Sequence, residues 1–237
     1  METTNEMKSR RPRRSKADIE AAIQRAAVAQ IKKKGFSLAL VTDIVKRAKI
    51  EPVVFYNRYK NLDEFYDKFV KQYDYWISTA IHKLSNSLDT PEGYAKALKE
   101  LTSNLLNDTV MTELLRWEVS EGTHITERTA RLREMDVNGI ITKYDSNSSE
   151  TDIIAISALI VGGIFFMVLH KDRSTFAGID INSPEGRERL DKAFRHIADR
   201  LFGTISERRR RLKLTECLRR EGLSPEAIER CLKESAL

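Results

Sequence analysis

Side chains that suit nucleic-acid recognition gather between residues 42 and 58. Arg58 can donate parallel hydrogen bonds to a guanine edge or bind a phosphate, and Asn57 can pair with adenine. Val53 and Val54 can contact the methyl group of thymine. From residue chemistry alone, the side chains that we expect to face a nucleic acid are Thr42, Val53, Val54, Tyr56, Asn57 and Arg58.

The distribution of charge along the chain agrees with a polyanionic partner. The 237 residues carry a formal net charge of +6. Residues 1–60 hold 15 Lys/Arg against 6 Asp/Glu, a net charge of +9, whereas residues 61–205 hold 17 against 23, a net charge of −6. Residues 206–237 hold 9 against 6, a net charge of +3. A basic head on an acidic body suits a protein whose head neutralises phosphates and releases their counterions.

Three short helices should position these side chains. Ser15 and Asp18 have the spacing of a capping box, and the apolar residues that follow repeat at helical spacing until Gly35, a helix stop. A second helix is expected over residues 41–48 and a third over 52–59, with Pro52 at its first position. Two short helices joined by about three residues form a helix-turn-helix, whose second helix can enter a major groove.

The rest of the chain is also expected to be helical. A long amphipathic helix should begin at Asn61 and continue to Leu84. Further helices are predicted near 91–107, 110–121, 124–143, 151–170, 184–204 and 224–234, with a polar loop over 145–150. The sequence therefore predicts an all-α protein, with no strand pattern. We divide it into a disordered basic arm (1–14), a helix-turn-helix domain (15–61), a helical ligand-binding and dimerisation domain (62–205) and a basic helical extension (206–237).

The stretch from Gly35 to Phe65 resembles the DNA-binding domain of the TetR family of bacterial transcriptional regulators. That family has a first helix that ends in Gly-aromatic, as Gly35-Phe36 does, and a recognition helix of the form aliphatic-Tyr-x-x-aromatic, as in Phe55-Tyr56-x-x-Tyr59. The resemblance implies that Tyr56 bonds a backbone phosphate. It further implies a homodimeric repressor that a small-molecule effector releases from a palindromic DNA operator.

Four residues depart from the family pattern. Ala39 and Leu40 stand where threonines usually begin the second helix, so that its cap and a hydroxyl for phosphate are either missing or supplied by Ser37 or Thr42. Lys49 replaces the glycine of the turn and must adopt a strained backbone or change the turn. Leu62 replaces the lysine that commonly binds phosphate at the start of the fourth helix, and Lys60 is the nearby substitute.

Other residues of the head have a second interpretation. Arg13 and Arg14 belong to the basic arm, which could lie in the minor groove of an A·T tract or stay a solvated tail. Val54 and Phe55 could both belong to the core, and Phe55 is expected there rather than on DNA. Glu51 is assigned to helix capping because its charge would repel phosphate. The basic run Arg208–Lys213 should continue the last core helix, with a second nucleic-acid contact as the alternative.

The acidic body offers aromatic side chains for an effector. The candidates are Tyr73, Trp76, Tyr94, Leu115, Trp117, His124, Phe165 and Met167. For each of them a place in the core is the more common outcome, because aromatic residues at helical spacing pack by default. Arg116-Trp117-Glu118 is the most unusual local combination, although its two charged residues could face water.

The segments 153–169 and 185–202 are the best candidates for a dimer interface. The first is too apolar for a helix that faces water, and Gly162-Gly163 permits close helix approach. We expect the interface to use Ile156, Leu159, Ile160, Gly163, Phe166, Phe194 and Ile197. The alternative for the chain as a whole is a helical interaction protein whose basic ends bind a membrane or RNA and whose segment 153–169 inserts into the bilayer or pairs with a partner.

Catalytic and metal-binding functions have no support in the sequence. No nucleophile-elbow, zinc-protease, P-loop or dinucleotide motif is present, and the four histidines, His82, His124, His170 and His196, stand singly on different expected helices. Cys217 and Cys231 are too few for a disulfide framework and have no zinc-ligand spacing with histidine. We therefore expect no enzyme activity, no cofactor, no metal and a cytoplasmic location.

Overall fold

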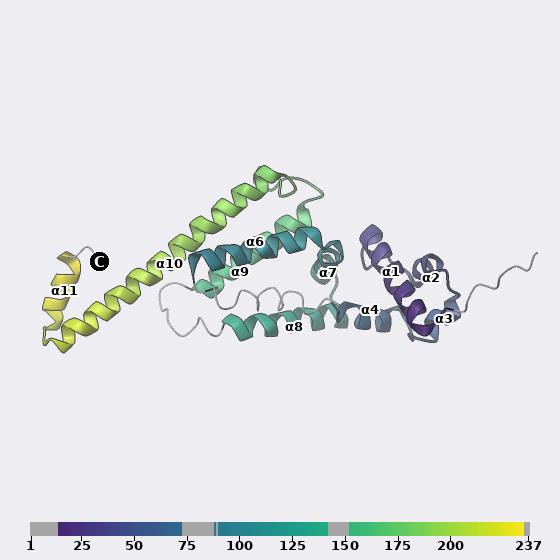
Figure 1. Ribbon diagram of the computed structural model, residues 1–237, viewed down its shortest axis with the longest axis horizontal. Helices are drawn as coiled ribbons and strands as arrows, with labels where there is room; N and C mark the ends of the chain where they lie inside the picture. The colour runs from purple at the N-terminus through teal and green to yellow at the C-terminus, as the bar shows by residue number, and fades with distance from the viewer. Residues whose placement is uncertain (1–13, 73–87, 89, 142–151, 235–237) are drawn as a thin grey trace, which may run out of the picture.

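The computed structural model describes residues 14–72, 88, 90–141 and 152–234. In this part of the chain the regular elements are all helices, and the one β-bridge joins Phe176 to Ile179 inside a loop. The expectation of an all-α fold is confirmed. The molecule is elongated, with the head of α1, α2 and α3 at one end and α11 at the other (Figure 1).

The head consists of three helices and the start of a fourth. They are α1 (Lys16–Lys34), α2 (Val41–Ala48), α3 (Pro52–Tyr56) and α4 (Leu62–Val70). Ser15 and Asp18 form the expected capping box, in which the Ser15 hydroxyl accepts from the Asp18 N–H at 3.0 Å. Asn61 caps α4 by accepting from the Glu64 N–H at 2.8 Å. The expected continuation of this helix to Leu84 lies outside the described residues.

The core of the head is apolar and strongly aromatic. Ile23, Ile44 and Phe55 are fully buried, one from each of the first three helices. Phe55 contacts the rings of Tyr59 and Phe65, with centroids 5.1 and 5.6 Å apart. The assignment of Phe55 to the core is thus borne out, and its burial is what holds the five-residue α3 on the head.

Two local expectations for the head need correction. The helix α3 ends at Tyr56, not at residue 59, because Tyr59 turns into the core. Glu51 occupies the N-cap position of α3 without a side-chain cap bond. For α2 the alternative of a missing cap holds, since its N-cap Leu40 makes no side-chain cap bond and the Ser37 hydroxyl instead bonds Glu121. Lys49 does adopt the left-handed backbone that its position required, at φ 54° and ψ 53°.

The body and the C-terminal region follow the expected helix order. They comprise α6 (Pro91–Asn107), α7 (Thr109–Ser120), α8 (His124–Ile141), α9 (Ile153–His170), α10 (Pro184–Arg220) and α11 (Pro225–Glu234). Thr90 and Ser183 cap α6 and α10 by accepting from backbone N–H groups at 3.1 and 2.9 Å, with proline in each first turn. The helix α10 does not end near residue 204, because the basic run continues it, as expected for Arg208–Lys213.

An aromatic cluster joins the head to the body. Trp117 of α7 stacks on Phe36, which follows α1, with centroids 5.0 Å apart and ring planes only 3° from parallel. Tyr66 of α4 packs edge-on against both rings, and its hydroxyl donates to the Ala39 carbonyl at 2.7 Å. Because Phe36 and Trp117 are 2% and 7% exposed, the head is fixed to α7 through a dry contact.

The backbone conformation at this junction explains why Gly35 is a glycine. This residue has φ 77°, which side chains disfavour. A Cβ atom built on it would lie 3.0 Å from the carboxylate of Glu113, so a larger residue would also have to displace the end of that flexible side chain.

The helix α7 also binds the two other helices that flank it. Arg116 donates to the Leu169 carbonyl at the end of α9 at 3.2 Å. Glu118 accepts two hydrogen bonds from Arg133 of α8, at 2.7 and 2.8 Å. The three residues of Arg116-Trp117-Glu118 thus each bind a different part of the fold, and neither charged residue simply faces water.

Truncation of the stacked tryptophan should destabilise the whole chain. We expect Trp117→Ala to lower the free energy of unfolding by about 3–5 kcal/mol, because it leaves a cavity between Phe36 and Tyr66. Val119→Ala, two residues away at a side chain that is 77% exposed, should change it by less than about 0.5 kcal/mol. Urea unfolding followed by circular dichroism measures both variants, and equal losses would contradict this role of the stack.

Glu121 should make the junction sensitive to acid. Its carboxylate accepts hydrogen bonds from the Ser37 hydroxyl and from the Trp117 indole N–H, and these bonds lower its pKa. A carboxylate with a lowered pKa in the folded state stabilises the fold above its unfolded-state pKa, and this contribution is lost as the pH falls through the folded-state pKa. Urea unfolding between pH 6 and pH 3 should therefore show a smaller loss of stability for Glu121→Gln than for the parent chain. Equal losses would contradict the assignment.

Candidate nucleic-acid interface

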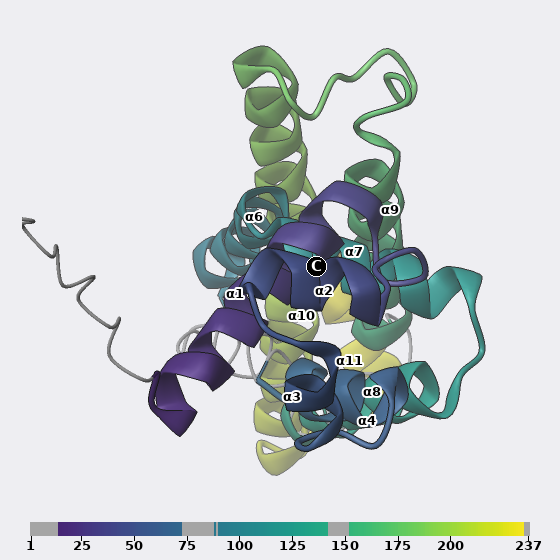
Figure 2. The same ribbon diagram turned by 90° about the vertical axis from the view of Figure 1, so that its right-hand side faces the viewer.

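The outer face of α3 is open to solvent at the end of the molecule that faces the viewer in Figure 2. Phe55 points inward, whereas Val53 and Tyr56 are 60% and 53% exposed. Asn57 is exposed at the end of the helix, and Val54 is half-buried. The Tyr56 ring packs edge-on against Phe55, but more than half of the surface of Val53 and Tyr56 stays available to a partner.

Thr42 and Lys60 add polar groups beside α3. Thr42 is exposed in the first turn of α2, and Lys60 is exposed between α3 and α4. The backbone N–H of Lys60 donates to the Glu64 carboxylate at 2.6 Å, so this hydrogen bond fixes the backbone of Lys60 and does not involve its ammonium group. The fold therefore brings five of the expected residues, Thr42, Val53, Tyr56, Asn57 and Lys60, to the surface of one small domain.

Arg58 has a different environment from the one that its chemistry suggested. Its guanidinium donates to the Val54 carbonyl at 2.8 Å, and Nε lies 3.9 Å from the Glu20 carboxylate of α1. The same carboxylate accepts a hydrogen bond from the Tyr59 hydroxyl. Burial and this bond raise the pKa of Tyr59. In this conformation Arg58 braces α3 against α1, and a contact with DNA requires its side chain to turn outward.

Arg14 fixes the root of the basic arm at the helix-turn-helix. Its guanidinium donates to the Ala48 carbonyl at 3.0 Å, at the last residue of α2. A cation at the negative end of a helix is stabilising. The bond places the start of α1 next to the turn at Lys49, whereas Arg13 lies outside the described residues. The choice between a minor-groove arm and a solvated tail stays a prediction.

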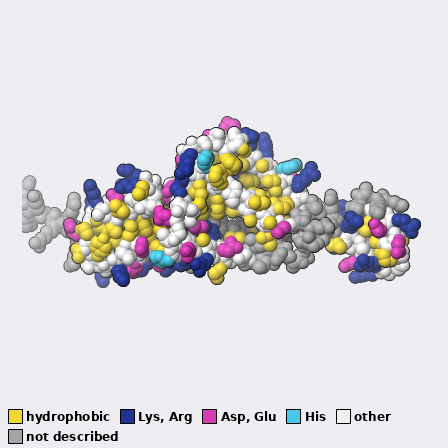
Figure 3. Space-filling view, turned by 180° about the vertical axis from the view of Figure 1, so that it is seen from behind, with side chains coloured by type: hydrophobic (Ala, Val, Ile, Leu, Met, Phe, Trp, Pro, Cys, Tyr) yellow, Lys and Arg dark blue, Asp and Glu magenta, His cyan; other side chains and the backbone are white. Residues whose placement is uncertain are grey.

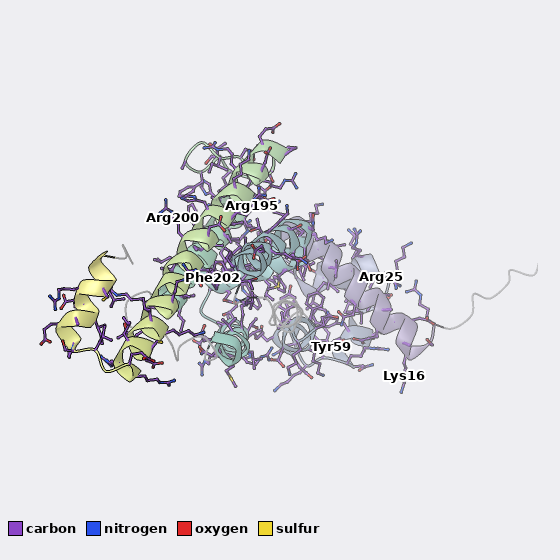
Figure 4. The ribbon with its side chains drawn as sticks, turned by 60° about the vertical axis from the view of Figure 1, so that its left-hand side comes forward. Lys16, Arg25, Tyr59, Arg195, Arg200 and Phe202 are labelled. Atoms are coloured by element: carbon purple, nitrogen blue, oxygen red, sulfur yellow. The ribbon has the colours of Figure 1, made fainter. Side chains whose placement is uncertain are left out.

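Several exposed cations of the head were missed by the sequence interpretation. Lys46, Arg47 and Lys49 surround the turn between α2 and α3, and all three are exposed. Their signal in the sequence is the run Lys46-Arg47-Ala48-Lys49, of which only Ala48 is buried. On α1, Lys16 and Arg25 are exposed as well (Figure 4). Together with Lys60 these groups form a basic surface suited to phosphates.

The residues expected to line an effector site do not converge in the described part of the body. Trp117 and Leu115 are buried in the core, and His124 is exposed at the start of α8. Tyr94 is buried, bonds the Ser157 hydroxyl at 2.8 Å and packs on Phe202 of α10 (Figure 4). Phe165 and Met167 are half-buried on α9, whereas Tyr73 and Trp76 lie outside the described residues.

One groove of about 370 Å³ lies between α6 and α10. Its lining is largely charged and includes none of the expected effector residues: Pro91, Glu92, Ala95, Lys96, Lys99, Asp191, Arg195 and Asp199. Lys99 pairs with Asp191 across it. Among the described residues, no group of three or more histidine, cysteine or carboxylate side chains is arranged to hold a metal ion.

The helix α9 leaves most of its apolar surface uncovered. Only Ile164 and Val168 are buried, whereas Leu159 and Phe166 are 77% and 48% exposed. Hydrophobic side chains gather on this part of the body when it is seen from behind (Figure 3). Ile156 and Ile160 are half-buried, and Gly163 is exposed. A Cβ atom built on Gly163 would have no described atom within 4 Å. The helix is also long and apolar enough to cross a membrane, with a mean hydropathy of 2.5 over 18 residues.

The two residues expected on α10 differ in their environment. Phe194 is 4% exposed and belongs to the core of its own body, whereas Ile197 is half-buried at its edge. The exposed part of the expected interface therefore lies on α9, whereas Phe194 is buried within its own chain.

Known structures show the same arrangement of helices, although no family model and no curated protein matches the chain. The transcriptional regulator FadR from Bacillus subtilis, solved in complex with stearoyl-CoA, matches with a TM-score of 0.56 at 17% identity, over 76% of this chain and 97% of its own. The fatty acid degradation regulator FadR from Bacillus halodurans matches with 0.54 at 16% identity, over 74% and 97%. A TetR family regulator from Marinobacter aquaeolei VT8 matches with 0.54 at 17% identity, over 76% and 95%. The chain therefore has the fold of the TetR-family transcriptional regulators.

Proposed function

We propose that this chain is a transcriptional regulator that binds double-stranded DNA through α3. The observation that carries the proposal is the division of α3 into a buried anchor, Phe55, and an exposed outer face with Val53, Tyr56 and Asn57. This face lies in a domain of net charge +9, beside the exposed cations of the α2–α3 turn. Apolar and amide groups can read base edges while the cations neutralise phosphates.

A homodimer would carry two α3 helices related by two-fold symmetry and so would match a palindromic DNA site. The exposed apolar side chains Leu159 and Phe166 support α9 as the contact between two copies. A second copy would cover these side chains and present two α3 helices to successive major grooves. We therefore infer a palindromic DNA operator and repression by occupancy.

The membrane alternative for α9 is less consistent with its packing. Ile164 and Val168 are buried in the core, and the Leu169 carbonyl accepts from Arg116 of the charged helix α7. Insertion of α9 into a bilayer would break these contacts and leave Arg116 without this partner. Fractionation separates the two: a soluble dimer without detergent supports a contact between copies, and recovery only in the membrane fraction supports insertion.

A small-molecule effector forms the last part of the proposal. The FadR neighbour that binds stearoyl-CoA makes a long-chain acyl-CoA the first compound to test. Of the expected effector residues, Phe165 and Met167, half-buried on α9, are the apolar side chains that we propose for contact with an acyl chain. A rise in the unfolding temperature with the acyl thioester, but not with free CoA, would support this effector class.

Removal of one hydroxyl tests the recognition helix. Tyr56→Phe should weaken operator binding by about ten-fold or more, since a hydrogen bond to a charged phosphate contributes about 1.5–3 kcal/mol. The same change at Tyr94 in the body is the matched control and should leave operator affinity unchanged. Fluorescence anisotropy at fixed salt measures both. Unchanged affinity of the Tyr56 variant would remove the phosphate contact from the proposal.

A charge on α9 tests the dimer contact. Leu159→Asp should convert the dimer to a monomer in the low micromolar range while the helix content stays constant, because the side chain is 77% exposed in a single copy. Val119→Asp, equally exposed on α7, should leave the dimer intact. Analytical ultracentrifugation measures the association of both variants. A dimer that survives Leu159→Asp would place the contact elsewhere.

A further inference from the structure

A group of polar side chains gathers around the carboxylate of Glu20 on α1. One carboxylate oxygen accepts hydrogen bonds from the Tyr59 hydroxyl (Figure 4) and, at 3.3 Å, from the Gln24 side-chain amide. The other oxygen lies 3.9 Å from Nε of Arg58. Arg58 and Tyr59 belong to the connection between α3 and α4. A single carboxylate of α1 therefore holds the segment that follows the recognition helix.

The contacts that hold Arg58 are ones that a stronger acceptor can replace. Its guanidinium donates to the Val54 carbonyl in the last turn of α3 at 2.8 Å, where a cation is favourable. The ion pair with Glu20 is long, and the two side chains are 22% and 43% exposed. A partly exposed ion pair of this length contributes little to stability. Arg58 is therefore placed against α1 without being locked there.

Glu20 keeps other partners when Arg58 leaves. Tyr59 is 4% exposed, and burial together with its bond to Glu20 raises the pKa of its hydroxyl, which therefore stays protonated and donates. Gln24 donates from the next turn of α1. A carboxylate stripped of all its partners in a partly buried site would be costly, but Glu20 retains two donors. The outward turn of Arg58 thus leaves a satisfied carboxylate behind.

Arg58 also stands at the end of α3 that is open to a partner. It directly follows the exposed Asn57, and Tyr56 is 53% exposed. A guanidinium offers several N–H donors in a fixed fork, which matches the two acceptors of a guanine edge in the major groove. Such a paired contact is stronger than a single carbonyl and a distant carboxylate. A guanine near this end of α3 can therefore replace Glu20 as the partner of Arg58.

We infer that Glu20 is a positioning residue for DNA recognition, which holds Arg58 against α1 in the free chain and yields it to a guanine of the operator. This inference rests on the proposed function of α3. Because the contact between Glu20 and Arg58 is lost on binding, it subtracts from what the guanine contact contributes. Glu20 therefore lowers both the affinity for the operator and the preference for guanine at one base position of each half-site.

A double-mutant cycle in the full-length chain tests this inference on an operator selected from random duplexes. Glu20→Gln removes the charge and keeps an oxygen that can accept from Tyr59. It should raise operator affinity by about three-fold or more, and its gain should fall to that of the control when Arg58 is changed to Ala. Glu51→Gln removes the same charge at an exposed residue beside α3 and is the matched control, with the same small effect in both backgrounds.

Sequence preference gives the second readout. Each guanine of the half-site is replaced in turn by adenine, and fluorescence anisotropy at fixed salt measures the loss of affinity. At one position the preference for guanine should disappear in Arg58→Ala and increase in Glu20→Gln, because only Arg58 reads that base and Glu20 opposes it. Urea unfolding verifies that the variants are folded.

The outcomes separate Glu20 from the recognition helix itself. An equal gain for Glu20→Gln with and without Arg58 would reflect only the loss of a negative charge near DNA, and would overturn the inference. A loss of affinity in Glu20→Gln, or an Arg58→Ala variant that discriminates bases as the parent does, would overturn it as well and leave Tyr56 and Val53 on the interface. A parent chain that binds no duplex would overturn the proposed function, and this inference with it.

The resonance of the Arg58 Nε–H group reports the exchange directly. In a ¹⁵N-labelled chain this resonance is identified by its absence from the Arg58→Ala spectrum, and it should shift when the operator is added. Arg133, whose guanidinium donates twice to Glu118 in the body, is the matched control and should keep its resonance. An Arg58 resonance that stays unchanged in the complex would overturn the inference.

Discussion

The stacked pair of Phe36 and Trp117 is the contact on which the arrangement of head and body depends. It joins the connection after α1 to the last turn of α7, at a site where both rings are buried. Around the two rings, Tyr66 bonds the backbone of the α1–α2 connection, and Glu121 receives both Ser37 and the Trp117 indole. Polar groups thus surround the stacked rings. Their directional hydrogen bonds fix the orientation of the head relative to α7, which apolar burial alone would not do.

This clamp connects the two functions that we assign to the chain. The helix α7 contacts the head through Trp117, the end of α9 through Arg116 and α8 through Glu118. The head carries the exposed face of α3, and α9 carries the exposed apolar face proposed for the second copy. Any change in the body that shifts α7 must therefore move the head or break the stack, because the stacked rings have no space to slip. If the proposed function holds, a ligand in the body could act through this contact on the spacing of two heads.

Local features of the fold could be predicted from the sequence, because their causes are local. The caps at Ser15, Asn61 and Ser183 depend on a side chain and an N–H group three residues away. The burial of Phe55 followed from helical spacing. The resemblance to the TetR family left Lys49 with either a left-handed backbone or a changed turn, and the structure has the left-handed backbone.

Other features depend on partners that are distant in the sequence. Arg58 folds back toward Glu20, and Ser37 bonds Glu121 instead of capping α2. Spacing within a helix contains no information about such pairs. The same limit applies to the candidate sites. The spacing on α3 predicts that Val53 and Tyr56 are exposed, whereas the role of the effector residues depends on how the helices of the body pack together.

The central claim is that the exposed face of α3 reads a two-fold DNA sequence. Selection from a pool of random duplexes by the purified full-length chain, followed by sequencing, tests it most directly. We predict enrichment of a palindrome whose half-sites lie about one helical turn apart or a multiple of it. Binding without enrichment of any sequence, or no binding at low salt, would contradict it.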